Sequence, residues 1–290
     1  MRDEKRKLQV SNGYSLAFEQ LAQILNAVNG RPDMKRVPRA FLVEQTGLAE
    51  RQVGSLVSIG CAIGVLRSTT GVLTEFGGLV AEHDIFFEMA GTLEFCHYAA
   101  AGNAHNVIWF DTFNELLTVM PNGDVEEWKG FFRSKYADEY SKKSMQKHVR
   151  VEVRFLVDAY LSRNLRKLEL IVAGSDGKLQ PRRYANPEPL VLAAMVYNFA
   201  ERTGRRVWEV EELAGAAGGP AILFRMDVDT FRQNIERLHE RGYVRLEARH
   251  NLDQVRLRDD YQPLCFLEAY YHEREPSPVE PKVDRQGRLL

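Results

Sequence analysis

Apolar residues recur at helical spacing near the start of this chain, where Leu16, Leu21, Ile24 and Val28 would share one face of a helix. Two shorter helices follow, and two apolar pieces around a polar turn are typical of a two-stranded hairpin. This order is typical of a winged-helix module, although helical hairpins in ordinary domains look similar. The expected helices cover residues 14–28, 38–46 and 49–63, and the hairpin covers 65–73.

The same order returns more clearly near the other end of the chain. Phe231, Ile235 and Leu238 are spaced to face a core from one helix, which Asp227 or Asp229 would cap and Gly242 would end. Two apolar stretches around a polar turn then predict a second hairpin. The expected helices cover residues 188–203, 207–216 and about 229–241, and the expected strands cover 243–248 and 254–257.

The middle of the chain is expected to be helical, with residues 141–148 forming a basic break between two helices. The sequence therefore predicts a mainly α fold with small β wings, in which two winged-helix modules flank a helical middle domain. The expected boundaries are a flexible leader at 1–12, an N-terminal winged-helix-like domain at 13–80, a middle domain at 81–186, a C-terminal winged-helix domain at 187–272 and a disordered tail at 273–290.

Charge and composition limit the possible partners. The 290 residues include 39 Lys and Arg against 40 Asp and Glu, a formal net charge of -1. A protein that binds DNA with its whole surface is usually basic, so any contact with nucleic acid must come from local patches. We expect a cytoplasmic protein, because no apolar run reaches the roughly 20 residues that span a bilayer and the N-terminus lacks a signal core.

Residues 73–98 carry the strongest resemblance to a known family. In this stretch and in residues 108–116, the chain resembles the bacterial domain of unknown function number four thousand and seven (DUF4007), a likeness that extends over about 70–275. Met89 and Ala90 depart from the acidic residue that members often carry there. The residues that carry the resemblance are Asp84, Gly91, Thr92, Leu93, His97, Tyr98, Trp109, Phe113 and Asn114.

The resemblance implies a setting more than an activity. Genes of this family tend to lie beside clusters for DNA phosphorothioation and phage exclusion. It therefore implies a role in DNA modification or antiviral defence, with proteins of such a complex as partners.

Basic residues of the two modules and the middle are the candidates for contact with duplex DNA. In a winged helix the third helix enters the major groove and the wing approaches the backbone. A solvated helix face or loop is the alternative at each place, and residues 225–258 carry eight Arg against six acids, which is a modest excess. The candidates are Arg51, Gln52, Ser55 and Arg67 in the N-terminal module, Lys142, Lys143 and Lys147 in the middle, and Arg232, Gln233, Arg245, Arg249 and His250 in the C-terminal module.

Signals for catalysis or for a cofactor are poor. His83, Cys96, His97 and His105 lack a familiar zinc spacing, and we expect His97 to be buried and hydrogen-bonded instead. The GAAGGP segment lacks the Lys that completes a phosphate loop. The three cysteines form no paired motif, so buried reduced thiols are expected. We expect no metal, no cofactor and no enzymatic activity.

Two functions remain in view. The first is a non-catalytic DNA-binding accessory or regulatory factor of a DNA-modification or anti-phage system. The second is a protein-interaction scaffold that docks its winged helices onto a modification enzyme or helicase without contacting DNA, which the near-neutral charge would suit. The sequence indicates neither a preferred DNA site nor an oligomeric state.

Overall fold

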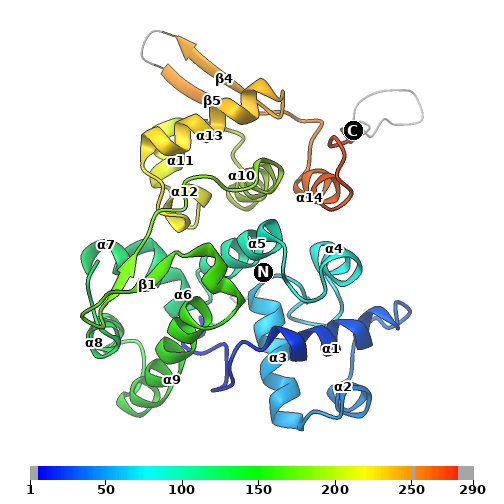
Figure 1. Ribbon diagram of the computed structural model, residues 1–290, viewed down its shortest axis with the longest axis vertical. Helices are drawn as coiled ribbons and strands as arrows, with labels where there is room; N and C mark the ends of the chain where they lie inside the picture. Colours follow the sequence, from blue (N-terminus) through cyan, green and yellow to red (C-terminus); the bar gives the residue numbers. More distant parts are fainter. Residues whose placement is uncertain (1–5, 250–251, 280–290) are drawn as a thin grey trace.

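The computed structural model describes residues 6–249 and 252–279. The chain is mainly helical with two small sheets, as the sequence predicts. In Figure 1 the C-terminal elements lie above the N-terminal and middle helices, and α5 (Ala90–Ala101) lies at the level where they meet. No helix in the described part of the chain is both long enough and apolar enough to cross a membrane.

The N-terminal helices follow the predicted order closely. Gly47, in the left-handed conformation with φ +67°, ends the second helix and lets the chain turn into the third. The hairpin expected after the third helix is reduced to one antiparallel bridge between Leu66 and Leu73. The elements are α1 (Phe18–Asn29), α2 (Arg39–Thr46), α3 (Glu50–Ala62) and α4 (Glu75–His83).

The segment before α1 is not the solvated leader that was expected, at least from residue 6 onward. Leu8 and Val10 are 5% and 4% exposed, so they belong to the core. The backbone of Lys7 bonds to His105 and to Val107, with N···O distances of 2.7 and 3.1 Å. The leader prediction failed because two isolated apolar residues among charged neighbours give no periodic signal; residues 1–5 lie outside the described part.

The middle of the chain is a set of helices around one aromatic-rich core. His97 lies inside it, fully buried, and its ring contacts Phe113, Tyr160 and Phe224 edge-on. The elements after α5 are α6 (Val107–Asp111), the π-helical turn η1 (Thr112–Leu116), α7 (Leu117–Val119), α8 (Val125–Lys135), α9 (Lys142–Leu161), the 3-10 turn η2 (Asn164–Leu168), β1 (Ile171–Ala173) and β2 (Leu179–Pro181).

Helix α9 starts seven residues earlier than the sequence suggested. Ser141 caps it by accepting a hydrogen bond from the Ser144 backbone N–H at 3.2 Å. Its first two turns therefore contain the basic segment that was expected to be a loop. Met145 is the one buried residue in these turns, so the apolar period is too sparse to recognise there.

The C-terminal elements enclose their own three-stranded antiparallel sheet, of order β3-β5-β4. The predicted inward ridge is confirmed, because Phe231, Ile235 and Leu238 are each 0% exposed. Strand β3 was not anticipated and replaces the start of a predicted helix. The elements are α10 (Pro189–Thr203), β3 (Val207–Glu209), α11 (Val210–Gly215), α12 (Pro220–Leu223), α13 (Val228–Glu240), β4 (Val244–Arg249), β5 (Leu252–Leu257) and α14 (Pro263–Tyr271).

The first residues of the expected disordered tail are packed against these elements. The Val279 backbone N–H donates to the Asp260 carbonyl at 2.7 Å, and Tyr243 donates its hydroxyl to Glu275 at 2.8 Å. The prediction is therefore wrong for residues 273–279, whose Pro-rich composition hid these contacts. Residues 280–290 lie outside the described part.

Candidate nucleic-acid interface

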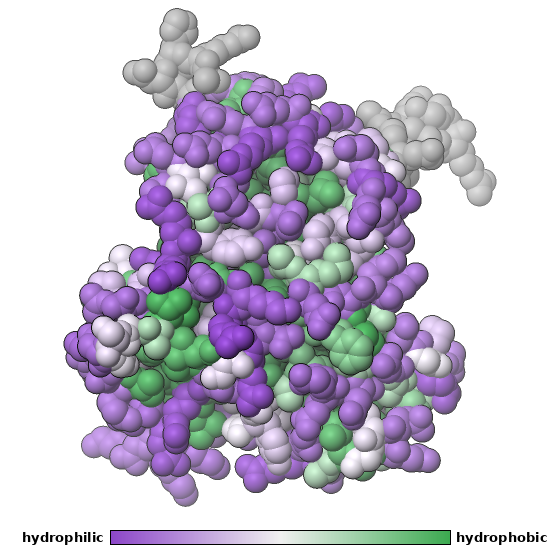
Figure 2. Space-filling model, viewed as in Figure 1, coloured by the Kyte–Doolittle hydropathy of each residue, from purple (hydrophilic) through white to green (hydrophobic). Residues whose placement is uncertain are grey.

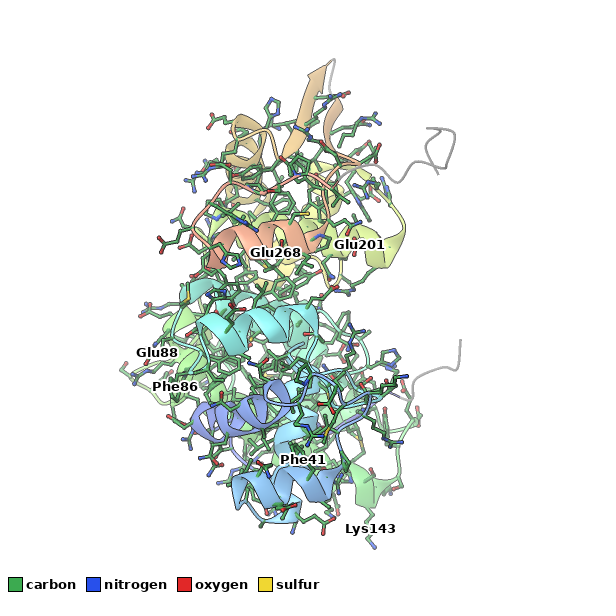
Figure 3. All side chains as sticks on the ribbon, turned by 90° about the vertical axis from the view of Figure 1, so that its right-hand side faces the viewer. Phe41, Phe86, Glu88, Lys143, Glu201 and Glu268 are labelled. Atoms are coloured by element: carbon green, nitrogen blue, oxygen red, sulfur yellow. The ribbon has the colours of Figure 1, made fainter. Side chains whose placement is uncertain are left out.

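A row of cations runs along the outer face of α9. Lys143, Lys147, Arg150 and Arg154 follow one another at intervals of four, three and four residues, so they lie on one side of the helix. All four are exposed, while Val149, Val153 and Leu156 on the opposite side are buried. Figure 3 shows Lys143 at the lower end of the molecule, pointing away from the ribbon. We call these four residues the α9 row.

The α9 row keeps its positive charge unneutralised. Among the residues that the structure describes, no Asp or Glu oxygen lies within 4.0 Å of these four cations. The nearest acids along the helix are accounted for, because Glu152 is buried on the other side and Asp158 pairs with Arg163 at 3.0 Å. The row is roughly 16 Å long, which is about five steps of a DNA strand.

A pocket of about 500 Å³ lies beside the row, between α9, the start of α3 and the segment before α1. Arg39, Arg51 and Lys147 line it together with Tyr14. Arg51 lies over the Tyr14 ring, with 6.0 Å from its guanidinium carbon to the ring centre. We call this the Arg51 pocket, and it joins a residue of the third N-terminal helix to the basic segment of the middle.

A second pocket, of about 360 Å³, adjoins the first one across Tyr14. It is lined by Arg150 and Arg154 of the α9 row, by Phe155 and by Asp158, which pairs with Arg163. Gly13, Tyr14 and Val151 belong to the walls of both pockets, so Tyr14 stands between them. We call this the Arg154 pocket.

A buried carboxylate holds the segment that carries Tyr14. Glu152 is 0% exposed and accepts hydrogen bonds from the Ser11 backbone N–H at 3.1 Å, the Ser11 hydroxyl at 2.8 Å and Trp109 Nε1 at 3.2 Å. Burial raises the pKa of Glu152, and these donors oppose the shift. Ser55 of α3 donates its hydroxyl to the Ser11 carbonyl. Two elements, α9 and α3, thus fix Ser11 just before Tyr14, and Trp109 of α6 holds Glu152 in place.

Two of the expected DNA contacts in the N-terminal helices have internal roles. Ser55 is 0% exposed, so it positions the Ser11 segment and cannot reach a ligand. Gln52 is half-buried and donates its amide to Gln20 of α1 at 2.6 Å, which leaves it poorly placed to read bases. Both follow the exposed Arg51 at the start of α3, where position alone does not reveal which way a side chain faces. Arg67 is exposed but lines none of these pockets.

From the predicted set, the structure brings Arg51 and Lys147 to one pocket and Lys143 and Lys147 to another; Lys142 is exposed at the start of α9. Sequence reasoning missed Arg39, Arg154 and Tyr14. The spacing of cations from Lys143 to Arg154 was the available signal. It would have been read as one helix face if α9 had been expected to start at residue 142.

The C-terminal candidates are more neutralised. Arg232 pairs with Glu236 at 3.0 Å and also with Asp253, so its charge is shared with two acids. Gln233 and Arg245 are exposed. Arg249 ends β4, but its side chain and all of His250 lie outside the described part.

Other residues that might have carried chemistry have structural partners. His97 Nε2 lies 3.0 Å from the Leu223 carbonyl and Nδ1 lies 2.6 Å from the Tyr160 hydroxyl, as expected of a buried, hydrogen-bonded histidine. Cys96 is buried and unpaired, and burial raises the pKa of the partly exposed Cys61 to about 11. Over the described ranges, no three His, Cys, Asp or Glu side chains are grouped so that they could hold a metal ion.

Known structures share this fold. A crystal structure of SspB described as magnesium-ion-bound has a TM-score of 0.71 and 15% identity, covering 91% of this chain and 86% of that one. A second SspB crystal structure has a TM-score of 0.68, with the same identity and the same coverage. At this identity the likeness concerns the fold. No curated protein matches the chain.

A family model matches residues 60–271, which is most of the chain and includes the segment from α4 to α14. The matched range contains the α9 row and leaves out Arg39, Arg51 and Tyr14. Its description is "Protein of unknown function (DUF4007)". The chain therefore belongs to the DUF4007 family.

Proposed function

We propose that this protein is a non-catalytic DNA-binding factor that contacts duplex DNA through the α9 row and the Arg51 pocket. The observation that carries the proposal is the row itself, four exposed cations on one helix face without acidic partners in the described part of the chain. Phosphate contacts supply most of the affinity for DNA, since each one releases condensed counterions. The net charge of the chain is -1, so a local group of cations such as this row is needed for contact with DNA.

The start of α3 supports the same assignment. Arg51 and Lys147 come from different parts of the sequence and line one pocket. Two elements that present cations to a common surface can hold two points of a phosphate backbone at once.

We further propose that residues 13–80 and 187–272 are winged-helix modules. The order of α10, β3, α11, α13, β4 and β5, with β5 between the other strands, supports this for the C-terminal part. Its charged residues suit the alternative role of docking onto a protein, because Arg232, Arg256 and Arg258 already pair with acids.

The surface carries little hydrophobic area that would support the alternative function as a protein-interaction scaffold. Figure 2 shows a mostly hydrophilic face on which hydrophobic residues form small, separate groups. The large exposed apolar residues of the described part are Phe86, Val119 and Val228, which lie far apart in the sequence. A protein partner of the C-terminal module would therefore be recognised mainly through polar contacts.

A role beside DNA-modifying or antiviral proteins fits a DNA-binding member of this family, and we include it in the proposal. A solved relative in fold is described as binding magnesium. We assign no magnesium ligands here. Over the described residues no three His, Cys, Asp or Glu side chains are grouped together, and the neighbouring carboxylates Asp111 and Glu115 both pair with Lys135.

The test is the salt dependence of binding to a 24-base-pair duplex, measured by fluorescence anisotropy. We expect the slope of log affinity against log salt to become shallower by about 0.9 for each phosphate contact removed in Lys143→Ala and Arg150→Ala. Arg245→Ala, an equal loss of charge on the C-terminal part, is the matched control and should leave the slope unchanged. A protein that binds no duplex even at low salt contradicts the proposal, and a loss confined to Arg245→Ala would move the interface to β4.

A further inference from the structure

Tyr14 lines two adjoining pockets that both contain cations. Arg39, Arg51 and Lys147 line the Arg51 pocket, and Arg150 and Arg154 line the Arg154 pocket together with Asp158. The ring is half-buried, and Arg51 packs over it at 6.0 Å. An intact duplex follows a flat row of cations and does not need an aromatic ring between two hollows.

Aromatic rings interleaved with cations are what proteins use to bind unpaired nucleotides. Each unpaired base exposes a face that stacks on an aromatic ring, while its phosphate meets a neighbouring cation. Both hollows, at about 500 and 360 Å³, are within the size range of ordinary small-ligand sites. Duplex DNA can fill such hollows only by turning nucleotides out of its stack or by being interrupted.

The segment that carries Tyr14 is held in advance of any ligand. Asn12 and Gly13 both have positive φ, at +50° and +89°, so the chain makes a sharp turn directly before the ring. Ser11 at the base of this turn is fixed by Glu152 and Ser55. A ring held this way loses little conformational freedom when a base stacks on it.

We propose that the Tyr14 site binds unpaired DNA, with one nucleotide in each pocket and the strand crossing the tyrosine ring. Its phosphates contact Arg51 and Lys147 on one side and Arg150 and Arg154 on the other. This inference rests on the proposed function, because the α9 row serves both. It narrows the preferred ligand to DNA that contains a gap or extruded nucleotides.

The experiment compares two DNA probes, a 24-base-pair duplex and the same duplex with a central gap of three unpaired thymidines. We expect the gapped probe to bind about tenfold more tightly, as one stacked base would provide. Tyr14→Ala should remove this preference, so that the variant binds the two probes with equal affinity. Tyr14→Phe keeps the stacking ring and should keep the preference.

Equal affinity of the unaltered protein for both probes, or a preference that survives Tyr14→Ala, would overturn the inference while leaving duplex binding intact. Failure to bind either probe would instead overturn the proposed function. A second measurement does not depend on the folding of a variant. Photocrosslinking from 5-iododeoxyuridine in the gap should label the peptide that contains Tyr14, and labelling confined to other peptides contradicts the assignment.

Discussion

At the scale of single residues, His97 shows how a buried titratable group can serve stability alone. The Leu223 carbonyl can only accept a hydrogen bond, so Nε2 carries the proton and Nδ1 accepts from the Tyr160 hydroxyl. Burial lowers the pKa of His97 to about 4. The ring therefore stays neutral in the folded protein at physiological pH.

This pKa predicts a loss of stability in mild acid. The unfolded chain binds a proton at His97 near pH 6.5 and the folded chain near pH 4, so the free energy of unfolding falls as pH drops between these values. By pH 5 the contribution of His97 to stability should be about 2 kcal/mol less favourable than at pH 7.5. Urea denaturation of the unaltered protein and of His97→Gln at both pH values measures it as a difference, because the buried Glu94 titrates over the same range with the opposite sign. His97→Gln cannot take up the proton, so it should gain stability relative to the unaltered protein as pH falls; no relative change would contradict the assignment.

Glu94 predicts a dependence of the opposite sign. It is 0% exposed, and burial raises its pKa to about 7, although Tyr184 and the Glu188 backbone N–H donate hydrogen bonds to it. The folded protein thus holds this proton more tightly than the unfolded chain does, so the contribution of Glu94 to stability should fall by about 3 kcal/mol as pH rises from 4 to 8. This change opposes the one from His97, and the difference between the unaltered protein and Glu94→Gln in urea denaturation isolates it. A difference that stays constant with pH would show that Glu94 has the same pKa in both states.

Single residues were also where sequence reasoning about the site was least secure. The burial of His97 was predicted correctly, because its neighbours are aromatic and apolar. Ser55 was taken for a DNA contact and is buried. Polar residues are usually exposed, and a buried serine is recognised only once its partner is known. That partner, the Ser11 carbonyl, lies 44 residues away.

At the scale of elements, α4 is pressed against the chain that leads out of α3. A Cβ placed on Gly77 would lie 1.9 Å from the Val65 carbonyl oxygen, while one on the adjacent Gly78 would meet nothing within 4 Å. Both glycines lie in the same helix and neither has a positive φ. Glycine is thus required at Gly77 by the close approach of two backbones.

These neighbours provide a matched pair of substitutions. Gly77→Ala should destabilise the protein by about 2 kcal/mol or more, because backbone must shift to make room. Gly78→Ala should stabilise it by up to about 1 kcal/mol, since alanine favours the helix. Thermal melting of the two variants checks both signs. Similar effects at the two positions would mean that α4 does not pack on Val65.

Elements with a dense apolar period were predicted well, and sparse or short ones were not. The bounds of α1, α10 and α13 differ from the predicted bounds by only a few residues. Strand β3 is three residues long and is specified by its pairing with β5, which lies about 45 residues further on. The start of α9 was not predicted because the residues that recur at helical spacing there are exposed cations. Its buried side has no such recurrence of apolar residues.

At the scale of the whole molecule, the middle and the C-terminal part are joined by buried and partly buried polar bonds as well as by packing. Asn114 accepts from the Gly218 backbone N–H at 2.7 Å, and the Thr92 and Tyr271 hydroxyls lie 2.7 Å apart. Separating these parts would leave such groups without partners, which is costly when they are buried. The expected middle and C-terminal domains thus share a core through His97 and Leu223, and Phe18 of the expected N-terminal domain packs on Phe87 of the middle one with 4.4 Å between ring centres.

We therefore expect the chain to unfold in a single cooperative transition. In scanning calorimetry the calorimetric enthalpy should equal the van't Hoff enthalpy. Arg202 reaches from α10 to the Gly102 carbonyl at 2.5 Å, and Arg202→Ala should lower the melting temperature of that one transition without dividing it. Two or more resolved transitions in the unaltered protein would show instead that the parts fold independently.

The buried side of α9 has a consequence for how the outer side works. Glu152 anchors the Tyr14 turn from the same helix that presents the cations, so the α9 row and the Tyr14 ring move together. A substitution of Glu152 would leave the Tyr14 ring without a fixed position and would not change any surface charge. A protein altered only in its interior would then keep its electrostatic affinity for nucleic acid and lose its ability to distinguish unpaired from paired nucleotides.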